Sequence, residues 1–437
     1  MQRVSGGRDA ISVLSAQVLL LLASLASQSI LAWALLPAGR GVYALFVALS
    51  TILPVVFMLG LDRSIQFYLM SGKIGLTQAL RALLMVWAGS VACSVLVGLS
   101  IGGNTGLPAP TQEPVQWLAG ISVIATASLY SMLIRMRVAV RQYGGYLAST
   151  VVQGVVNLSL LSILWKVEVL GAATAVAALA FSYGVASLVS LRALGNARLE
   201  CKHGQNVGEL RRKIATYGIR FYPALVGHAL DFNLGTIALG AVAANSDVGI
   251  FAALAALMLR LLLLAQAFQE AMLPRISADE GGRVHLVVQL ARLASMTTLA
   301  IGLLFALVSR PVLAVLLSPK FAEHFLLVWW MLPGVAVHAA STLLMPYFEG
   351  TERPVIVSIA VWCGLAVNLV VVLLGFPVMG LDSAGLAMSL GMFARFTLLV
   401  TAFTSVSGVS AAAFFGLRRA DLELVRSLVV RARKGGI

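Results

Sequence analysis

Charged residues are scarce in this sequence. Asp, Glu, Lys and Arg make up 11% of its 437 residues, and 60% of the residues are hydrophobic, whereas a soluble domain is typically about 25% charged. The mean hydropathy is +0.95. A chain of this length with so few charges cannot present a polar surface to water. The composition therefore excludes a soluble protein and predicts an integral membrane protein.

Cysteine and the motifs of common catalytic sites are also lacking. The three cysteines are Cys93, Cys201 and Cys363, and their spacing suggests neither a disulfide nor a metal site. The chain contains no Gly-x-x-x-x-Gly-Lys-Ser/Thr loop for ATP and no His-Glu-x-x-His zinc motif. We therefore expect no catalytic residue, no metal and no cofactor, and a protein that is not an enzyme.

Long apolar stretches are abundant, and a membrane helix needs about 20 such residues. Stretches without Asp, Glu, Lys or Arg in the first half are 10–39, 41–61, 82–112, 114–134, 142–165 and 169–191. The second half offers 293–309, 325–348 and 354–381, together with 215–240, 248–270 and 383–405, which contain Asp231, Arg260 and Arg395 respectively. The sequence thus predicts an all-α membrane protein with about twelve transmembrane helices.

The basic residues are distributed unevenly between the two sets of loops. Of the 31 Lys and Arg residues, only Arg40, Lys166, Arg310 and Lys320 fall in the loops opposite the N-terminus, apart from the two inside predicted helices. Because basic loops stay in the cytoplasm, both termini are predicted to be cytoplasmic. The net charge of +14 then indicates contact with anionic membrane lipids and not with nucleic acid.

Two halves are visible in the chain. A basic linker, 193–214, separates a predicted N-terminal six-helix lobe, 1–192, from a C-terminal one, 215–406, and a basic cytoplasmic tail, 407–437, follows. The sequence Gly-Val-Tyr-Ala at Gly41 corresponds to Gly-Ile-Phe-Ala at Gly249, each at the start of a predicted helix. An even number of helices per half gives both halves one orientation, as in transporters built from parallel repeats.

Several segments carry a family resemblance over about residues 10–405. They are GRGVYALF from Gly39, GLDRSIQFYL from Gly60, YGIRFYPALVGHALDFNLGTIALG from Tyr217, DVGIFAALAAL from Asp247 and PGVAVHAASTLLMPYFEGTERP from Pro333. In their order and spacing they resemble the polysaccharide transporter family, the Wzx-type flippases of O-antigen and exopolysaccharide. That family belongs to the multidrug/oligosaccharidyl-lipid/polysaccharide (MOP) exporter superfamily, with multidrug exporters and lipid II flippases.

The resemblance implies a function. Such flippases translocate undecaprenyl-diphosphate-linked oligosaccharide across the inner membrane by alternating access of two pseudo-symmetric lobes around a central cavity. The implied partners are this lipid-linked oligosaccharide, membrane lipids, the polysaccharide polymerase and other export machinery.

Cationic and amide side chains inside predicted helices are the candidates for binding such a substrate. Arg260 lies too deep in its helix to reach the surface, Arg395 lies centrally in the last helix, and guanidinium groups bind phosphate bidentately. Arg220 lies at the start of the seventh helix. Gln17 and Gln28 share a face of the first helix and suit sugar hydroxyls. The alternatives are a salt bridge of Arg260 or Arg395 to Asp231, and simple helix packing for the amides.

Titratable residues are candidates for coupling or gating. Asp231 shares a face of the seventh helix with Arg220, about 20° away on the helical wheel, and His228 is about 80° from that direction. Such groups can couple transport to a proton or sodium gradient, although hydrogen bonds between packed helices explain them equally well. Asp62 and Arg63 end the second helix at its cytoplasmic side, where they are either a gate or simply solvated.

Two other functions compete with the flippase. A membrane glycosyltransferase, such as an O-antigen polymerase or ligase, would need a large external loop for acid-base chemistry, and the external gaps here are short and nearly uncharged. A small-molecule efflux transporter of the multidrug exporter type would need acidic groups for cationic drugs, whereas the candidate residues here are mainly cationic.

Overall fold

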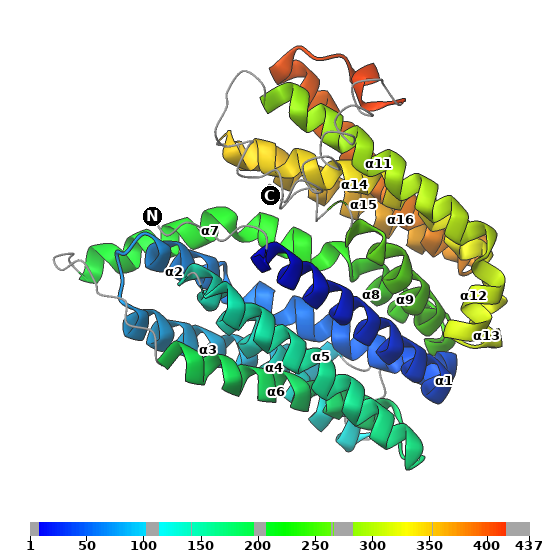
Figure 1. Cartoon of the computed structure of the whole chain (residues 1–437), viewed down its shortest axis with the longest axis horizontal. Helices are drawn as coiled ribbons and strands as arrows, with labels where there is room; N and C mark the ends of the chain where they lie inside the picture. The colour runs from blue at the N-terminus through cyan, green and yellow to red at the C-terminus, as the bar shows by residue number, and fades with distance from the viewer. Residues whose placement is uncertain are drawn as a thin grey trace. The chain divides into compact units, whose positions relative to one another are not determined.

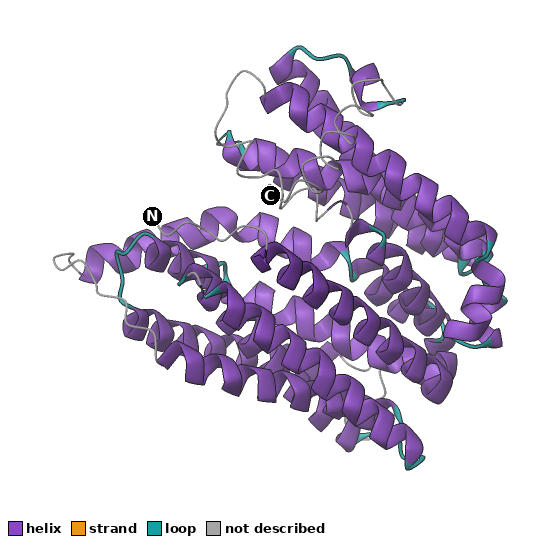
Figure 2. Cartoon of the chain, in the orientation of Figure 1, coloured by secondary structure: helices purple, strands orange, loops and turns teal. Residues whose placement is uncertain are grey.

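The computed structural model describes residues 8–101, 113–140, 142–195, 207–263, 265, 283–351 and 353–416. Side chains are described from residue 21 onward, except at 101, 143, 195, 207–211, 221, 283, 349, 350 and 354. All regular elements in these ranges are helices (Figure 2). Backbone groups inside a bilayer have no water to bond to, and a helix satisfies them within one segment. The chain is thus an all-α, multi-pass membrane protein, which confirms the predicted fold class.

The first helix, α1 (Arg8–Met58), holds two of the predicted membrane helices. A straight helix of its 51 residues would be about 77 Å long, more than twice the ~30 Å of a bilayer core. Leu36 has a non-helical backbone (φ 55°, ψ 178°), and Pro37 follows it. Because proline cannot complete the helical hydrogen bonds, the chain kinks there. Arg40, predicted to lie in an external loop, is instead inside this kinked helix.

Five further helices complete the first half of the chain. A left-handed turn at Leu59 and Gly60 ends α1. The helices that follow are α2 (Leu61–Met70), α3 (Leu76–Ile101), α4 (Pro114–Ala139), α5 (Tyr143–Lys166) and α6 (Ala172–Gly195) (Figure 1). Helix α6 packs against both α4 and α5. Helix α2 is too short to cross a bilayer, and the other four match predicted membrane helices.

The second half begins with a broken membrane helix. Helix α7 (Val207–Asp231) starts inside the predicted linker, and α8 (Leu234–Val242) follows it after two residues. The membrane-crossing part of α7 is bent by 62° against α8. At the break, the Asn233 side chain donates to the carbonyl of Ala229, 2.9 Å away. Helix α9 (Asn245–Arg260) comes next.

The remaining helices form a second bundle. They are α11 (Arg283–Leu307), α12 (Ser309–Leu316), α13 (Pro319–Ala322), α14 (Leu326–Gly350), α15 (Pro354–Met379), α16 (Asp382–Ser407) and the short 3-10 helix η2 (Ala411–Phe414). Helix α16 packs against α14 and α15, and α11 packs against α14. Nine described helices are long and apolar enough to cross a membrane, and the bent pair α7 and α8 makes a tenth. Counting α1 as two and adding α9 accounts for the twelve predicted helices.

The chain packs as two compact units. We call Ala16–Gly249 the N-terminal unit, and Ile250–Ile437 together with Met1–Ser15 the C-terminal unit. The division therefore falls within α9, whereas the sequence places it in the 193–214 linker. The lobe boundaries drawn from the sequence stay a prediction.

The two glycines that correspond in the predicted repeat lie against each other. A Cβ on Gly41 would lie 1.9 Å from the carbonyl oxygen of Asn245, and a Cβ on Gly249 would lie 1.9 Å from that of Pro37. Only glycine leaves room for two helix backbones to approach this closely. Both glycines therefore serve the contact between the kink of α1 and the start of α9.

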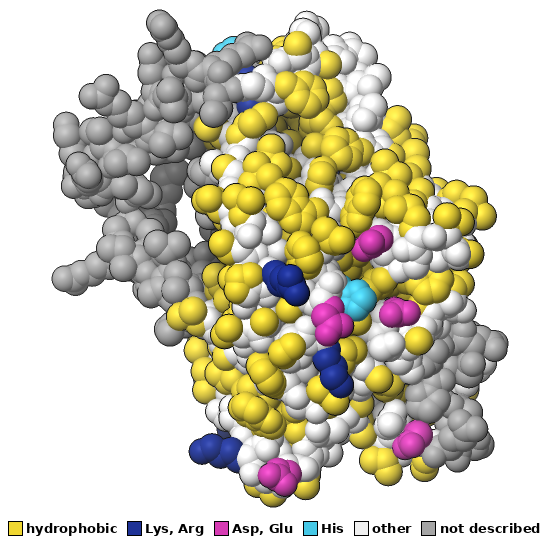
Figure 3. Space-filling view, turned by 90° about the vertical axis from the view of Figure 1, so that its right-hand side faces the viewer, with side chains coloured by type: hydrophobic (Ala, Val, Ile, Leu, Met, Phe, Trp, Pro, Cys, Tyr) yellow, Lys and Arg dark blue, Asp and Glu magenta, His cyan; other side chains and the backbone are white. Residues whose placement is uncertain are grey.

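The outer surface suits contact with lipid. Large apolar side chains are widely exposed, among them Leu374 at 73% and Val378 at 84% on α15. Figure 3 shows a face on which hydrophobic side chains predominate and charged ones are few. Exposed apolar surface on this scale is costly in water and is what a membrane helix presents to acyl chains.

Candidate functional site: a hydroxyl-lined cavity and its arginine

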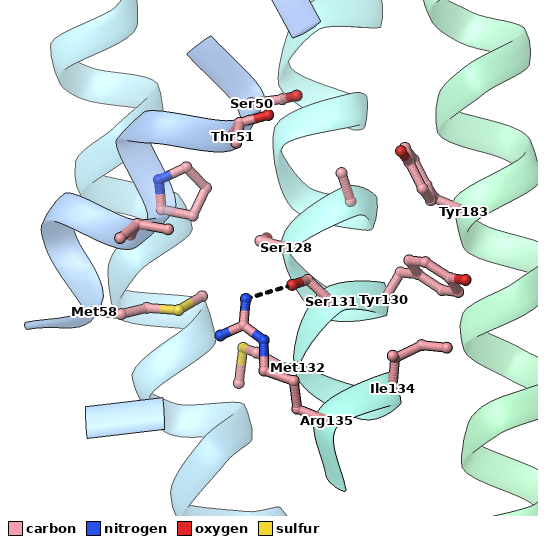
Figure 4. Close-up of a pocket in the computed structure, with 13 residues that line it drawn as sticks. Ser50, Thr51, Met58, Ser128, Tyr130, Ser131, Met132, Ile134, Arg135 and Tyr183 are labelled. Atoms are coloured by element: carbon pink, nitrogen blue, oxygen red, sulfur yellow. Dashed lines mark hydrogen bonds between the residues drawn. The ribbon is translucent and has the colours of Figure 1, made fainter. Parts of the chain in front are cut away.

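A cavity of about 340 Å³ lies inside the N-terminal unit, between the second part of α1, α4 and α6 (Figure 4). Its polar lining consists of hydroxyl groups and one guanidinium. The residues that line it are Ser50, Thr51, Pro54, Val55, Met58, Ala127, Ser128, Tyr130, Ser131, Met132, Ile134, Arg135 and Tyr183. The cavity is thus polar on several sides although it lies within membrane helices.

The helices themselves satisfy the small hydroxyls. Ser50 and Thr51 donate to the carbonyl of Val47, at 2.8 and 3.0 Å, and Ser128 donates to that of Ile124 at 2.6 Å. Each hydroxyl oxygen keeps acceptor capacity after donating its proton. These side chains therefore fit inside a membrane helix at little cost and still offer acceptors toward the cavity.

Two tyrosines form another part of the lining. The rings of Tyr130 on α4 and Tyr183 on α6 are 5.2 Å apart, centroid to centroid. The Tyr130 hydroxyl lies 3.2 Å from Thr150 Oγ1 on α5. Aromatic faces and phenolic hydroxyls together suit a ligand with both apolar and hydroxyl-bearing faces.

Arg135 provides the positive charge at this cavity. Its Nη1 forms an ion pair with Asp62, its Nη2 donates to Ser131 Oγ at 2.7 Å, and its side chain is 28% exposed. Asp62 lies in the first turn of α2 and is buried, where the positive end of the helix dipole favours a carboxylate. The turn at Gly60 directs α2 so that Asp62 reaches α4. The ion pair thus joins α2 to the cavity wall.

A second arginine on α4 has a different environment. Arg137 is 2% exposed and donates to the carbonyl of Gly145 and to Ser149 Oγ, the latter at 2.8 Å. Its other terminal nitrogen lies 3.5 Å from the carbonyl of Val189 on α6. A Cβ on Gly145 would come within 2.8 Å of this guanidinium. Arg137 therefore ties α4 to α5 and α6.

A third arginine lies next to the kink of α1. Arg40 is 3% exposed, donates to Gln28 Oε1, and has its guanidinium carbon 5.0 Å from the centre of the Tyr43 ring. Its Nε and Nη1 atoms are buried and have no hydrogen-bond partner among the described residues. A buried guanidinium with unused donors is costly unless an acceptor reaches it.

Among the described residues of the C-terminal unit, Arg292 and Arg395 are buried cations. Arg395 on α16 is 1% exposed, and its Nη1 lies 3.4 Å from Nδ1 of His338 on α14. Arg292 on α11 is 4% exposed and donates to the carbonyl of Ala413 at 2.6 Å. Arg292 thus holds η2 against the bundle.

The structure places the other predicted site residues as follows. Arg260 is half-buried in the last turn of α9, and not at the centre of a continuous helix. Arg220 is exposed on α7, and His228 and Asp231 are half-buried in the last turn of α7, next to its break. Gln17 lies in α1, outside the range of described side chains.

The predicted gate residues occupy a different element from the one expected. Asp62 and Arg63 belong to the first turn of α2 and do not end the preceding membrane helix, because the chain turns at Leu59 and Gly60 before them. Asp62 is buried and Arg63 is exposed. Within the described part of the chain, no group of three or more His, Cys, Asp or Glu side chains is placed to hold a metal ion.

Arg135 escaped the sequence analysis. A search for charge-free stretches ends the fourth membrane helix at Ile134 and assigns Arg135 and Arg137 to a cytoplasmic loop, yet α4 continues to Ala139. The spacing of Met132, Met136 and Ala139, which are all buried, is the signal that the helix and its packed face continue past the first arginine.

Comparison with models of protein families and with curated protein sequences gives no match. Solved structures do match over nearly the whole chain. An inward-facing multidrug resistance transporter of the MATE family, in the MOP superfamily, has a TM-score of 0.68 and 13% identity over 90% of this chain and 96% of that one. The lipid II flippase MurJ in an inward closed conformation has a TM-score of 0.67 and 12% identity over 94% of this chain and 92% of that one.

The chain has the fold of the MOP transporters. A third structure with this fold, a MOP superfamily transporter from Pyrococcus furiosus, has a TM-score of 0.53 and 13% identity over 92% of this chain and 94% of that one. Identities this low show a shared fold and leave the cargo of each transporter open. What this chain does must therefore be argued from its own side chains.

Proposed function

We propose that this chain is a flippase that translocates undecaprenyl-diphosphate-linked oligosaccharide across the inner membrane for the synthesis of a surface polysaccharide. The observation that carries the proposal is the sign of the charge buried in the helices. Among the described residues, the buried charged side chains are Arg40, Asp62, Arg137, Arg292 and Arg395. Arg137 and Arg292 hold neighbouring elements together, which leaves Arg40 and Arg395 as candidates for a substrate pathway. Because ionised groups at membrane depth are costly, those that occur tend to mark such pathways, and positive charge favours an anionic cargo.

The cavity in the N-terminal unit offers suitable chemistry for part of that cargo. Serine, threonine and tyrosine hydroxyls exchange hydrogen bonds with sugar hydroxyls, and the Arg135 guanidinium binds phosphate or an acidic sugar. At about 340 Å³ the cavity is at the small end of the usual range for ligand sites, roughly 300 to 1,000 Å³. It suits one segment of the headgroup and not a whole repeat unit.

The structural neighbours allow two cargo classes. A lipid II flippase supports a lipid-linked saccharide, and a multidrug exporter supports efflux of small molecules. One neighbour is described by a "reverse polarity of binding pocket" that "suggests different function", so pocket charge can separate functions within this fold. Here the buried carboxylate among the described residues is Asp62, and it is paired with Arg135. Because Arg135 already occupies this carboxylate, it is not available to bind a cationic drug, which favours the anionic cargo.

The break between α7 and α8 supports the coupling part of the proposal. Discontinuous membrane helices form substrate and ion sites in many transporters. His228 and Asp231 lie in the last turn before the 62° bend. We assign to Asp231, with His228, the coupling of transport to a proton or sodium gradient. Asp231→Asn should then abolish uphill transport while leaving exchange of bound cargo intact.

Leaflet sorting of the lipid-linked saccharide tests the function. A strain lacking this chain should accumulate the saccharide on the cytoplasmic side and lose its surface polymer, and the wild-type chain should restore both. Periplasmic accumulation of unpolymerised units would instead indicate a polymerase or ligase. An unchanged pool would contradict the flippase, and drug sensitivity in the same strain would favour efflux.

A further inference from the structure

A second cavity, of about 440 Å³, lies between α2 and α7 in the N-terminal unit. Its lining is basic and aromatic: Tyr68 from α2, and Arg212, Lys213, Thr216, Tyr217 and Arg220 from α7. Residues 212, 216 and 220 are spaced four apart and therefore share one face of α7. Three cationic side chains thus line one small space in which no lining residue is acidic.

The walls of this cavity are fixed relative to each other. Ser64 Oγ on α2 donates to the carbonyl of Ile214 on α7 at 2.6 Å. A Cβ on Gly60 would lie 2.4 Å from the carbonyl oxygen of Gly218, so the backbones touch at the turn before α2. Because the two walls are already held together, they lose little conformational entropy when a ligand binds between them.

Aromatic rings form the α2 side of the site. The Tyr217 ring stacks on Phe67 with centroids 4.6 Å apart, and Tyr68 meets Tyr217 edge to face at 6.2 Å. Lys73 adds a fourth cation, 5.5 Å from the centre of the Tyr68 ring. Tyrosine hydroxyls donate to anions, and tyrosine is typical of the boundary between headgroups and acyl chains.

Exposed apolar side chains lie next to the basic lining. Phe67, Met70 and Ile219 are 43%, 61% and 63% exposed. Phe67 and Ile219 are adjacent in sequence to lining residues, and Met70 lies on the same short helix as Tyr68. The combination of lysine and arginine with exposed large apolar side chains is the pattern of a lipid interface. Repulsion among the clustered cations is relieved when an anion enters.

We propose that this cavity binds the phosphate group of an anionic membrane phospholipid, with the acyl chains lying along Phe67, Met70 and Ile219. Basic pockets between membrane helices bind the headgroups of such lipids. The bound lipid bridges α2 and α7, and so stabilises the helix that carries Asp62 and the start of the helix that carries Asp231. This inference is independent of the flippase proposal, because it concerns a resident lipid and not the cargo.

Native mass spectrometry of the purified chain, titrated with phosphatidylglycerol or phosphatidylcholine, tests the site. Wild type should retain phosphatidylglycerol selectively. Arg212→Gln and Arg220→Gln should each weaken this binding about fivefold, because each removes about one basic contact with the headgroup. The double variant should weaken it about 25-fold. Arg81→Gln is the matched control, because Arg81 is exposed at the start of α3 and outside the lining, and it should leave binding unchanged.

Three results would overturn the proposal. Equal weakening by Arg81→Gln would show a nonspecific charge effect, and unchanged binding in the double variant would place the lipid elsewhere. Displacement of phosphatidylglycerol by polyprenyl diphosphate, but not by inorganic phosphate, would assign the cavity to the transported lipid. The midpoint of unfolding in detergent shows whether each variant is folded. The Tyr217→Phe variant keeps the ring stack and loses only one hydroxyl, so its binding should weaken only about twofold.

Discussion

Arg135 and Arg137 lie two residues apart on α4 and occupy opposite environments. Two residues correspond to about 200° around a helix, so one side chain points toward α2 and the cavity and the other toward α5 and α6. Arg137 is enclosed by a serine hydroxyl and backbone carbonyls, and Arg135 by a carboxylate, a hydroxyl and open space. The same residue type is a structural tie in one place and part of a cavity wall in the other.

The difference teaches what makes a buried arginine available for function. Fixed dipoles around Arg137 engage both of its terminal nitrogens and leave no room for a ligand there, although its Nε has no hydrogen-bond partner among the described residues. An ion pair at a cavity wall satisfies the charge and still leaves some donors facing the cavity. Burial alone therefore does not identify a transport residue; the partners and the adjoining space do.

The largest expected effect is on stability, at the structural tie. Arg137→Met should lower the free energy of unfolding by about 3 kcal/mol, because it removes one hydrogen bond to the carbonyl of Gly145 and one to Ser149 Oγ, which keeps Ser190 as its other donor. Unfolding in mixed detergent measures the change. Arg137→Lys should not restore stability, since one ammonium nitrogen cannot reach the acceptors on α5 and α6 that two guanidinium nitrogens contact. A Met variant as stable as wild type would remove the distinction between the two arginines.

Neutralising the ion pair should affect transport more than stability. The double variant Asp62→Asn with Arg135→Gln removes both charges together, so its stability should stay within about 1 kcal/mol of wild type. Flipping of lipid-linked saccharide in proteoliposomes should fall about 30-fold, as expected for the loss of about 2 kcal/mol from one charge-assisted contact. Arg63→Gln, an exposed neighbour of Asp62, is the control. Wild-type flipping by the double variant would show that Arg135 is also only structural.

The strength of the ion pair can be measured by a double-mutant cycle. The single changes Asp62→Asn and Arg135→Gln each leave one charge without its partner, and the double change does not. We expect a coupling free energy of about 1.5 kcal/mol in unfolding experiments, below that of a fully enclosed pair because Arg135 is 28% exposed. Additive effects would mean that the two side chains interact with other groups.

The smallest expected effect is at the cavity hydroxyls. Tyr183→Phe removes one hydroxyl from the lining and should slow flipping about twofold, for about 0.5 kcal/mol, without a change in stability. Tyr130→Phe removes a hydroxyl that also contacts Thr150, so it should lower both flipping and stability. Equal flipping rates in all three proteins would show that the cargo does not reach this wall of the cavity.

The sequence was most informative about the helices and least informative about their contacts. The described helices are consistent with the twelve predicted membrane helices, because the bilayer demands long apolar stretches. The kink of α1 was predicted as a loop, although Pro37 was visible, because the charge of Arg40 suggested an external turn. Arg137 was assigned to a loop for the same reason.

The candidate site could be predicted only in part. Gln28 and Asp62 were candidates from the sequence, whereas their partners Arg40 and Arg135 were assigned to loops. Membrane helices are apolar on nearly every side, so periodicity does not reveal which face meets which neighbour. Side-chain pairs between helices depend on crossing and rotation, which the residue pattern leaves open.

The sequence by itself determined that this chain crosses the membrane many times, which segments are helical, and that arginines lie within them, since each follows from the cost of moving polar groups into hydrocarbon. Only the tertiary structure decided which arginine holds helices together, which lines a cavity, and which glycines allow two backbones to touch. Those outcomes depend on contacts between side chains at distances of a few ångströms. Lipid solvates every apolar face of a helix equally well, so the sequence pattern does not indicate which face packs against which neighbour.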